Sequence, residues 1–262
     1  MNKKNIEKIL KLIVLFIFLI FLIYLIFGRS NILSSAERTL IYEKRYIIFL
    51  NGLYQTLIIS FSSIAIGSIL GIFICYLRMN KNKYIYLFGK IIILLLQGLP
   101  ITVLLLIFYY CIFGKVNIEP TLVAIISFSI YFSAYTAEIY RGALESINKT
   151  QIDSAYSLGF TKIQTLKYVI IPQMLSYIIP VFKNEGVSII KLTSIVGFIS
   201  ICDLTRASEI VRNRTYEAFF PLLLTAFIYY LLCYLFSKLL DLIYKKINPR
   251  KACRVYGEYN RG

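Results

Sequence analysis

Long uncharged runs of apolar residues alternate with short polar segments along most of this 262-residue chain. An α-helix needs about 20 apolar residues to cross the ~30 Å hydrocarbon core of a bilayer. We therefore predict an all-α membrane protein with about six transmembrane helices. The predicted spans cover approximately residues 12–28, 53–77, 91–114, 120–137, 180–202 and 218–237.

The first apolar run, residues 12–28, follows four lysines and has two interpretations. It could be a cleaved signal peptide, because Ser34, Ser35 and Ala36 offer the small residues that a cleavage site needs. However, the run exceeds the roughly 7–15 residues of a signal-peptide core. We expect an uncleaved first helix.

One polar stretch, residues 150–173, interrupts this apolar pattern and contains two capping signals. Thr150 precedes Asp153 by three residues, and Thr161 precedes Gln164 by three residues. A threonine hydroxyl can accept the third helical N–H, while the third side chain reaches back to the cap. The spacing predicts two short helices.

Gly159 lies between the two capping signals, where a left-handed residue would end the first helix. Pro172 is expected to stop or restart the second helix. Ile152, Ala155 and Tyr156 share one face of the first helix. The stretch is either a docking element between two spans or an ordinary capped loop.

The charge distribution predicts how the chain is oriented. The net charge of +16 would suggest a nucleic-acid partner in a soluble chain, but only 16% of the residues are charged and 58% are hydrophobic. With six spans and a cytoplasmic N-terminus, 19 of the 29 Lys and Arg lie inside, 8 lie outside and 2 fall within the fifth span. The positive-inside rule favours this orientation. It predicts cytoplasmic N- and C-termini, a cytoplasmic central stretch, attraction to membrane lipid, and no nucleic-acid partner.

The chain contains no sequence pattern for catalysis or for metal binding. It has no G-x-x-x-x-G-K-[ST] phosphate loop, no histidine, and no C-x-x-C pair among its five cysteines. We therefore expect a transport subunit that is not an enzyme and binds no metal or cofactor. A docking element without an ATP site implies that a separate chain uses ATP.

Charged residues inside the predicted spans are candidates for a translocation path. Lys191, followed by Thr193 and Ser194, is flanked by apolar runs. Such a charge lines a path, or else it forms an ion pair or snorkels to the interface. Glu138 precedes Arg141 by three residues, so it either lines the path or forms an interfacial pair on one helix.

Several motifs in order resemble the permease subunits of polar-amino-acid ABC importers, of the histidine/glutamine permease type. DSAYSLGFTKIQTLKYVIIPQ is similar to their EAA loop, with Asp153-Ser154-Ala155, Gly159 and Ile171-Pro172 in the matching places. Further matches extend the resemblance over about residues 50–248. They are EIYRGALESINKTQ at 138–151, Pro172-Gln173, Pro180, Asn184, KLTS at 191–194, and Asn51-Gly52 with Thr56.

The resemblance implies a five-helix type I importer core with a cytoplasmic coupling helix and an added N-terminal helix. The expected divisions are 1–49 for that helix and its linker, 50–248 for the permease domain, and 249–262 for a basic cytoplasmic tail. The implied ATPase-docking residues are Gln151, Asp153, Ser154, Ala155, Gly159 and Pro172. The residues assigned to the path are Glu138, Lys191, Thr193 and Ser194.

The implied partners are two ABC ATPase subunits, a second copy or a sister permease, an extracellular substrate-binding protein and an amino-acid substrate. ATP would be used by the partner ATPase, and the complex would lie in a prokaryotic plasma membrane. The alternatives are a secondary transporter or channel without an ATPase, and a membrane scaffold.

The chain departs from the family pattern at several positions. Asp153 and Ser154 replace Glu and Ala, Gln97 stands where the family has Arg, and Leu192 replaces an Asp. Thr150 also stands in place of a Gly. The two missing charges, at Gln97 and Leu192, imply either a different substrate or charges that a partner permease supplies.

Overall fold

A computed structural model describes residues 37–217 and 219–247, and these residues form helices joined by short connections. The α-helices are α3 (Tyr46–Arg78), α4 (Lys83–Gly98), α5 (Ile101–Leu106), α6 (Pro120–Glu145), α7 (Lys149–Ser157), α8 (Lys162–Thr165), α9 (Ile171–Leu192), α10 (Leu204–Thr215) and α11 (Phe219–Ile247). Shorter helical turns are η1 (Glu37–Ile41), η2 (Tyr42–Lys44), η3 (Ile107–Ile112), η4 (Leu166–Ile170) and η5 (Thr193–Ile199).

The predicted membrane architecture is confirmed over the described residues. Four helical segments are long and apolar enough to cross a bilayer: 46–78, 120–145, 162–199 and 219–247. The bent pair of α4 with α5–η3 makes a fifth. The predicted first span, residues 12–28, lies outside the described residues, as does the predicted basic tail.

Helices α3 and α6 pack closely because two glycines of α3 leave room for the backbone of α6. A Cβ atom at Gly67 would lie 2.7 Å from the Ser129 carbonyl oxygen, and one at Gly71 would collide with the Thr136 side chain. The G-x-x-x-G pair therefore serves close helix approach, which is its common use in membranes. Ile59, Phe128 and Phe132 fill the core beside this contact.

The predicted span 91–114 is wrong as a single straight helix. Helix α4 begins earlier, at Lys83, and the chain turns by 102° between Gly98 and Ile101. Proline restricts its own φ and forces the preceding residue into extended backbone. Accordingly, Leu99 has φ −94° and ψ 134°, and Pro100 caps α5. Because the whole run is uncharged, its hydropathy does not reveal this break.

The second half of the central stretch is more helical than predicted. Pro172 lies where a helix restarts, because α9 begins at Ile171. Pro180 lies inside α9, and residues 162–199 together form one long helical segment. A π-helical turn, η4, precedes Pro172, and its last hydrogen bond runs from the Ile171 N–H to the Leu166 carbonyl oxygen. The wider turn accommodates the hydrogen bond that a proline removes.

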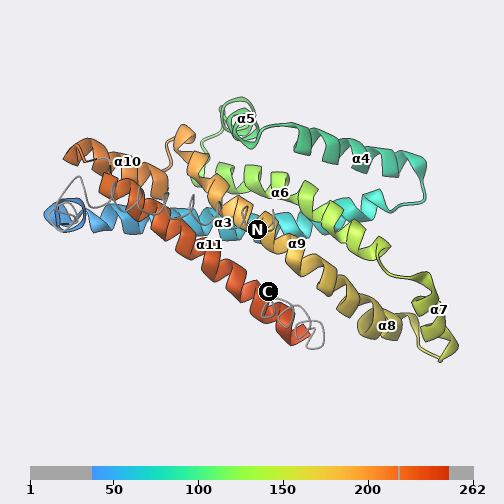
Figure 1. The fold of residues 1–262 in the computed structure, drawn as a ribbon. Helices are drawn as coiled ribbons and strands as arrows, with labels where there is room; N and C mark the ends of the chain where they lie inside the picture. Colours follow the sequence, from blue (N-terminus) through green and yellow to red (C-terminus); the bar gives the residue numbers. More distant parts are fainter. Residues whose placement is uncertain (1–36, 218, 248–262) are drawn as a thin grey trace, which may run out of the picture.

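The polar elements gather at the two ends of the bundle. Figure 1 shows α7 at one end, beyond α6 and α8, and α10 at the opposite end beside the start of α3. We call these the α7 end and the α10 end. The spans between them run side by side, so any path through the bundle connects these two ends.

Candidate docking element and translocation path

The first helix of the docking element, α7, starts two residues earlier than predicted. Its cap is Asn148, not Thr150, and the Asn148 Oδ1 accepts a hydrogen bond from the Thr150 N–H at 3.0 Å. The Thr150 hydroxyl donates to the same oxygen at 2.6 Å. Asparagine is among the strongest N-caps, which explains why it displaces the threonine.

The turn after α7 has the geometry that the sequence predicted. Gly159 has a φ of +83°, the Gly159 N–H donates to the Tyr156 carbonyl, and the Phe160 N–H donates to the Ala155 carbonyl. These two hydrogen bonds form a Schellman motif. A Cβ atom at Gly159 would have nothing within 4 Å, so the glycine is required for its φ and not for space.

The second predicted cap, at the start of α8, is confirmed in full. The Gln164 N–H donates to Thr161 Oγ1 at 3.3 Å, and the Thr161 N–H donates to Gln164 Oε1 at 2.8 Å. Both groups are exposed, so this capping box is a local signal that needs no tertiary support. It fixes the direction in which the chain leaves the turn.

The residues assigned to docking lie on different sides of this helix–turn–helix. Gln151, Asp153, Ser154 and Gly159 are exposed, Ala155 is buried against the rest of the element, and Pro172 lies further along the chain at the start of α9. Sequence reasoning missed the apolar tip. The side chains of Leu158 and Ile163 are each 77% exposed on either side of the turn, with Tyr156 and Leu166 also exposed. We call these four residues the docking tip.

The residues assigned to the path divide between two places. Lys191 is exposed on α9, Thr193 is buried in η5 with its hydroxyl donating to the Ile190 carbonyl at 2.7 Å, and Ser194 lines a neighbouring pocket. Glu138 lies elsewhere. It accepts hydrogen bonds from Arg141 on its own helix and from Arg78 at the end of α3.

Lys191 borders an open groove of about 530 Å³ between α9 and α11. The other lining residues come from α11 and carry no charge: Ala226, Tyr229, Tyr230, Cys233, Tyr234 and Ser237. Asn184, Ser188 and Lys191 are all exposed and share one face of α9 at helical spacing. A polar face on a helix that is long and apolar enough to span the bilayer suits a water-filled path or a partner better than lipid.

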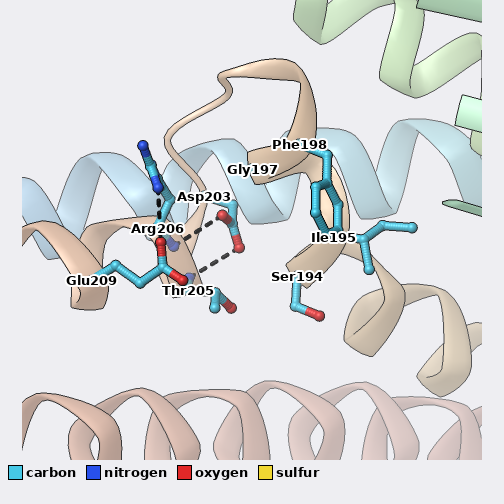
Figure 2. A pocket seen from close by; sticks show the side chains of 8 residues that line it. All are labelled: Ser194, Ile195, Gly197, Phe198, Asp203, Thr205, Arg206 and Glu209. Atoms are coloured by element: carbon cyan, nitrogen blue, oxygen red, sulfur yellow. Dashed lines mark hydrogen bonds and ion pairs between the residues drawn. The ribbon is translucent and has the colours of Figure 1, made fainter. Parts of the chain in front are cut away.

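A second, smaller pocket of about 160 Å³ lies between η5 and the start of α10. Figure 2 shows Ile195 and Phe198 on one wall, with Asp203, Arg206 and Glu209 on the other. The Asp203 carboxylate accepts the N–H groups of Thr205 at 2.9 Å and Arg206 at 3.1 Å, which caps α10. Arg206 and Glu209 form an ion pair at 2.9 Å.

Asp203 is the residue at the α10 end that sequence reasoning did not single out. It is fully buried, and it also accepts a hydrogen bond from the Tyr229 hydroxyl of α11 at 3.2 Å. The Thr56 hydroxyl of α3 accepts the Leu204 N–H at 3.2 Å. Burial raises the pKa of the Asp203 carboxyl, although the hydrogen bonds from Thr205, Arg206 and Tyr229 lower it in part. Helix α11 thus contacts the carboxyl that caps α10, and α3 contacts the first backbone N–H of α10 beside it.

Comparison with known proteins relates this chain to membrane subunits of transporters. Residues 63–251 match the family described as binding-protein-dependent transport system inner membrane component. The probable amino-acid ABC transporter permease protein YckA of Bacillus subtilis is 34% identical over 75% of this chain and 88% of its own length. The L-cystine transport system permease protein TcyB of the same organism is 29% identical over 80% of this chain and 90% of its own length.

Solved structures agree on the architecture. An amino acid ABC transporter solved with histidines superposes with a TM-score of 0.71 at 34% identity, over 83% of this chain and 99% of that one. The MetNI methionine ABC transporter superposes with a TM-score of 0.63 at 18% identity, over 76% of this chain and 96% of that one, which supports the fold alone. The fold is that of type I ABC-importer permeases. The chain belongs to the family of inner membrane components of binding-protein-dependent transport systems.

Proposed function

We propose that this chain forms the path by which a polar amino acid is imported, and that α7 with its docking tip seats a separate ABC ATPase subunit. The observation that carries the proposal is the exposed apolar tip on a turn between two capped helices. Burying a leucine side chain contributes about 1.5–3 kcal/mol, so Leu158 and Ile163 are suited to insertion into an apolar socket. The exposed carboxylate of Asp153 would then contact polar groups of the ATPase at the edge of that socket.

The amino-acid substrate is supported by similar proteins and by the groove chemistry. YckA and TcyB are named for amino-acid and L-cystine transport, respectively. In this chain, Lys191 is exposed beside a groove whose other lining residues include three tyrosines and one serine, and no carboxylate lines the groove. Such a surface attracts the carboxylate that every amino acid carries.

The remaining partners follow from this assignment. A second copy of the chain, or a sister permease, would cover the exposed polar face of α9, and each permease would seat one ATPase. An extracellular binding protein would deliver the substrate at the α10 end. The α7 end would then face the cytoplasm, in agreement with the excess of Lys and Arg predicted for that side.

Transport would proceed by alternating access. ATP-driven closure of the two ATPases displaces α7, and the displacement passes through α6 and α9 into the bundle. ATP and the amino acid can shift the balance between inward-open and outward-open states only through different affinities for the two.

Co-purification with the ATPase subunit tests the docking assignment. We expect Leu158→Asp and Gly159→Val to insert into the membrane but to lose the ATPase, because the first places a charge in the socket and the second disrupts the turn. Tyr84→Asp is the matched control, since Tyr84 is 83% exposed at the start of α4 and lies outside the docking tip. Retention of the ATPase by both docking variants would contradict the proposal and favour a transporter that works without one.

A further inference from the structure

Four charged side chains form a compact cluster where α3 and α6 approach the α7 end. The Glu138 carboxylate accepts hydrogen bonds from Arg78 Nε at 3.4 Å and from Arg141 Nε at 2.9 Å and Nη2 at 2.6 Å. Arg141 also pairs with Glu145 one turn further along α6. We call Arg78, Glu138, Arg141 and Glu145 the inner ion cluster.

The inner ion cluster joins three helices. Arg78 is the last residue of α3, and its guanidinium lies 4.7 Å from the ring centroid of Tyr86 on α4. Glu138 and Arg141 belong to α6. The close approach of α4 to α3 continues at Gly89, where a Cβ atom would lie 3.1 Å from the Leu77 Cβ. The cluster therefore holds the ends of α3, α4 and α6 together.

The charges of the cluster balance each other, with two guanidinium groups and two carboxylates. Both oxygens of Glu138 are engaged, Oε1 by Arg78 and Oε2 by Arg141. The Arg78 side chain is only 13% exposed, so the pair is shielded more than an ordinary surface ion pair. A carboxylate occupied on both sides is poorly suited to bind a passing substrate.

The position of the inner ion cluster along α6 suits it to transmit movement from α7 rather than to bind a substrate. Helix α6 ends at Glu145 and α7 begins at Lys149, and Ile147 in the short link is buried. At 1.5 Å per residue, Glu138 lies about 10 Å along α6 from Glu145. Any displacement of α7 must act on this end of α6, and the Arg78–Glu138 pair connects that end to α3.

We propose that Glu138 is a positioning residue that couples the movement of α7 to α3, and that it does not line the translocation path. This inference rests on the proposed function, because it requires an ATPase seated on α7. The cluster makes α3, α4 and the base of α6 move as one body when α7 is displaced. Without the pair, the ends of α3 and α6 nearest α7 can move separately, although the two helices remain packed at Gly67 and Gly71.

The test measures the amount of amino acid transported per ATP hydrolysed, in proteoliposomes that contain the whole complex. We expect Glu138→Gln to retain the ATPase and its basal hydrolysis but to lower this ratio by about fivefold or more, a common size for coupling between sites. Glu138→Asp, which keeps the charge, should recover part of the ratio. Arg38→Gln is the control, because the Arg38 side chain is 70% exposed and pairs with Glu217, away from the inner ion cluster.

A double-mutant cycle distinguishes coupling from a general loss of stability. If Arg78 and Glu138 act as one unit, Arg78→Gln combined with Glu138→Gln should lower the ratio no further than either change alone. Fewer assembled complexes with a wild-type ratio per complex would overturn the inference, as would additive losses. A wild-type chain that never associates with an ATPase would instead contradict the proposed function.

Discussion

The hydroxyl of Thr136 donates a hydrogen bond of 3.2 Å to the Gly67 carbonyl oxygen and so joins α6 to α3. The same packing leaves no room for a side chain at Gly67, where a Cβ atom would lie 2.7 Å from a backbone oxygen of Ser129. We expect Gly67→Ala to lower the free energy of unfolding by about 1–3 kcal/mol, since neither backbone can move aside cheaply.

Thermal unfolding of the purified protein in detergent measures this cost. Gly98→Ala is the matched control, because a Cβ atom at Gly98 would have nothing within 4 Å. The control should change the unfolding temperature little. Equal shifts for the two variants would mean that the close approach at Gly67 contributes no stability.

The cap of α7 provides a second prediction. Asn148→Ala removes the acceptor of the Thr150 N–H and should destabilise α7 by about 1 kcal/mol, whereas Thr150→Ala should cost less. Hydrogen exchange of the first amides of α7 measures the difference. The exchange should accelerate in Asn148→Ala and change less in Thr150→Ala. Faster exchange in Thr150→Ala than in Asn148→Ala would mean that Thr150 is the cap.

The buried carboxyl of Asp203 makes stability depend on pH. Its pKa is raised by burial above the ordinary value, so the folded state binds the proton more tightly than the unfolded chain does. The stability that this group provides is complete below the unfolded pKa of about 3.9. It is lost as the pH rises through the folded pKa.

Asp203→Asn removes this titration but keeps a side chain that caps α10 well. We therefore expect the unfolding temperature of the variant, relative to that of the wild type, to increase from acidic to neutral pH. Asp203→Ala should be less stable than Asp203→Asn at every pH, because the cap itself is lost. A difference between Asp203→Asn and the wild type that does not change with pH would contradict the argument.

Local signals in the sequence predicted most of the docking element. The capping box of Thr161 with Gln164 and the left-handed Gly159 each depend on residues within a few positions, so their patterns are sufficient. The cap at α7 was misassigned because Asn148 and Thr150 compete for the same role two residues apart, and the sequence does not rank them.

Contacts between residues that are far apart in the sequence could not be predicted from such local patterns. The bend at Pro100 lies inside an uncharged run that is long enough for one span, so hydropathy cannot separate the two helices. Glu138 was paired correctly with Arg141, three residues along, but its bond to Arg78 joins residues 60 positions apart. The hydrogen bond between Asp203 and Tyr229 likewise joins residues 26 positions apart. Such pairs are set by the way in which the helices pack, and the spacing of residues along the sequence does not predict them.

Lys191 provides the sharpest prediction about the path. Its ammonium is exposed at the groove between α9 and α11, and no carboxylate lines that groove. If it binds the carboxylate of the substrate, Lys191→Ala removes a hydrogen bond to a charged group, which is worth about 1.5–3 kcal/mol. We expect uptake at limiting substrate to decrease by about tenfold or more, while the ATPase remains associated.

Lys191→Arg, which keeps the charge, should retain more uptake than Lys191→Ala. Lys167→Ala is the control, because Lys167 is an exposed lysine of the same helical segment that lies in η4, outside the groove. Uptake and the substrate stimulation of ATP hydrolysis should decrease together in Lys191→Ala, because both require the occupied path. Unchanged uptake kinetics would assign Lys191 to snorkelling or to a contact with the second permease, and the carboxylate of the substrate would then need another partner.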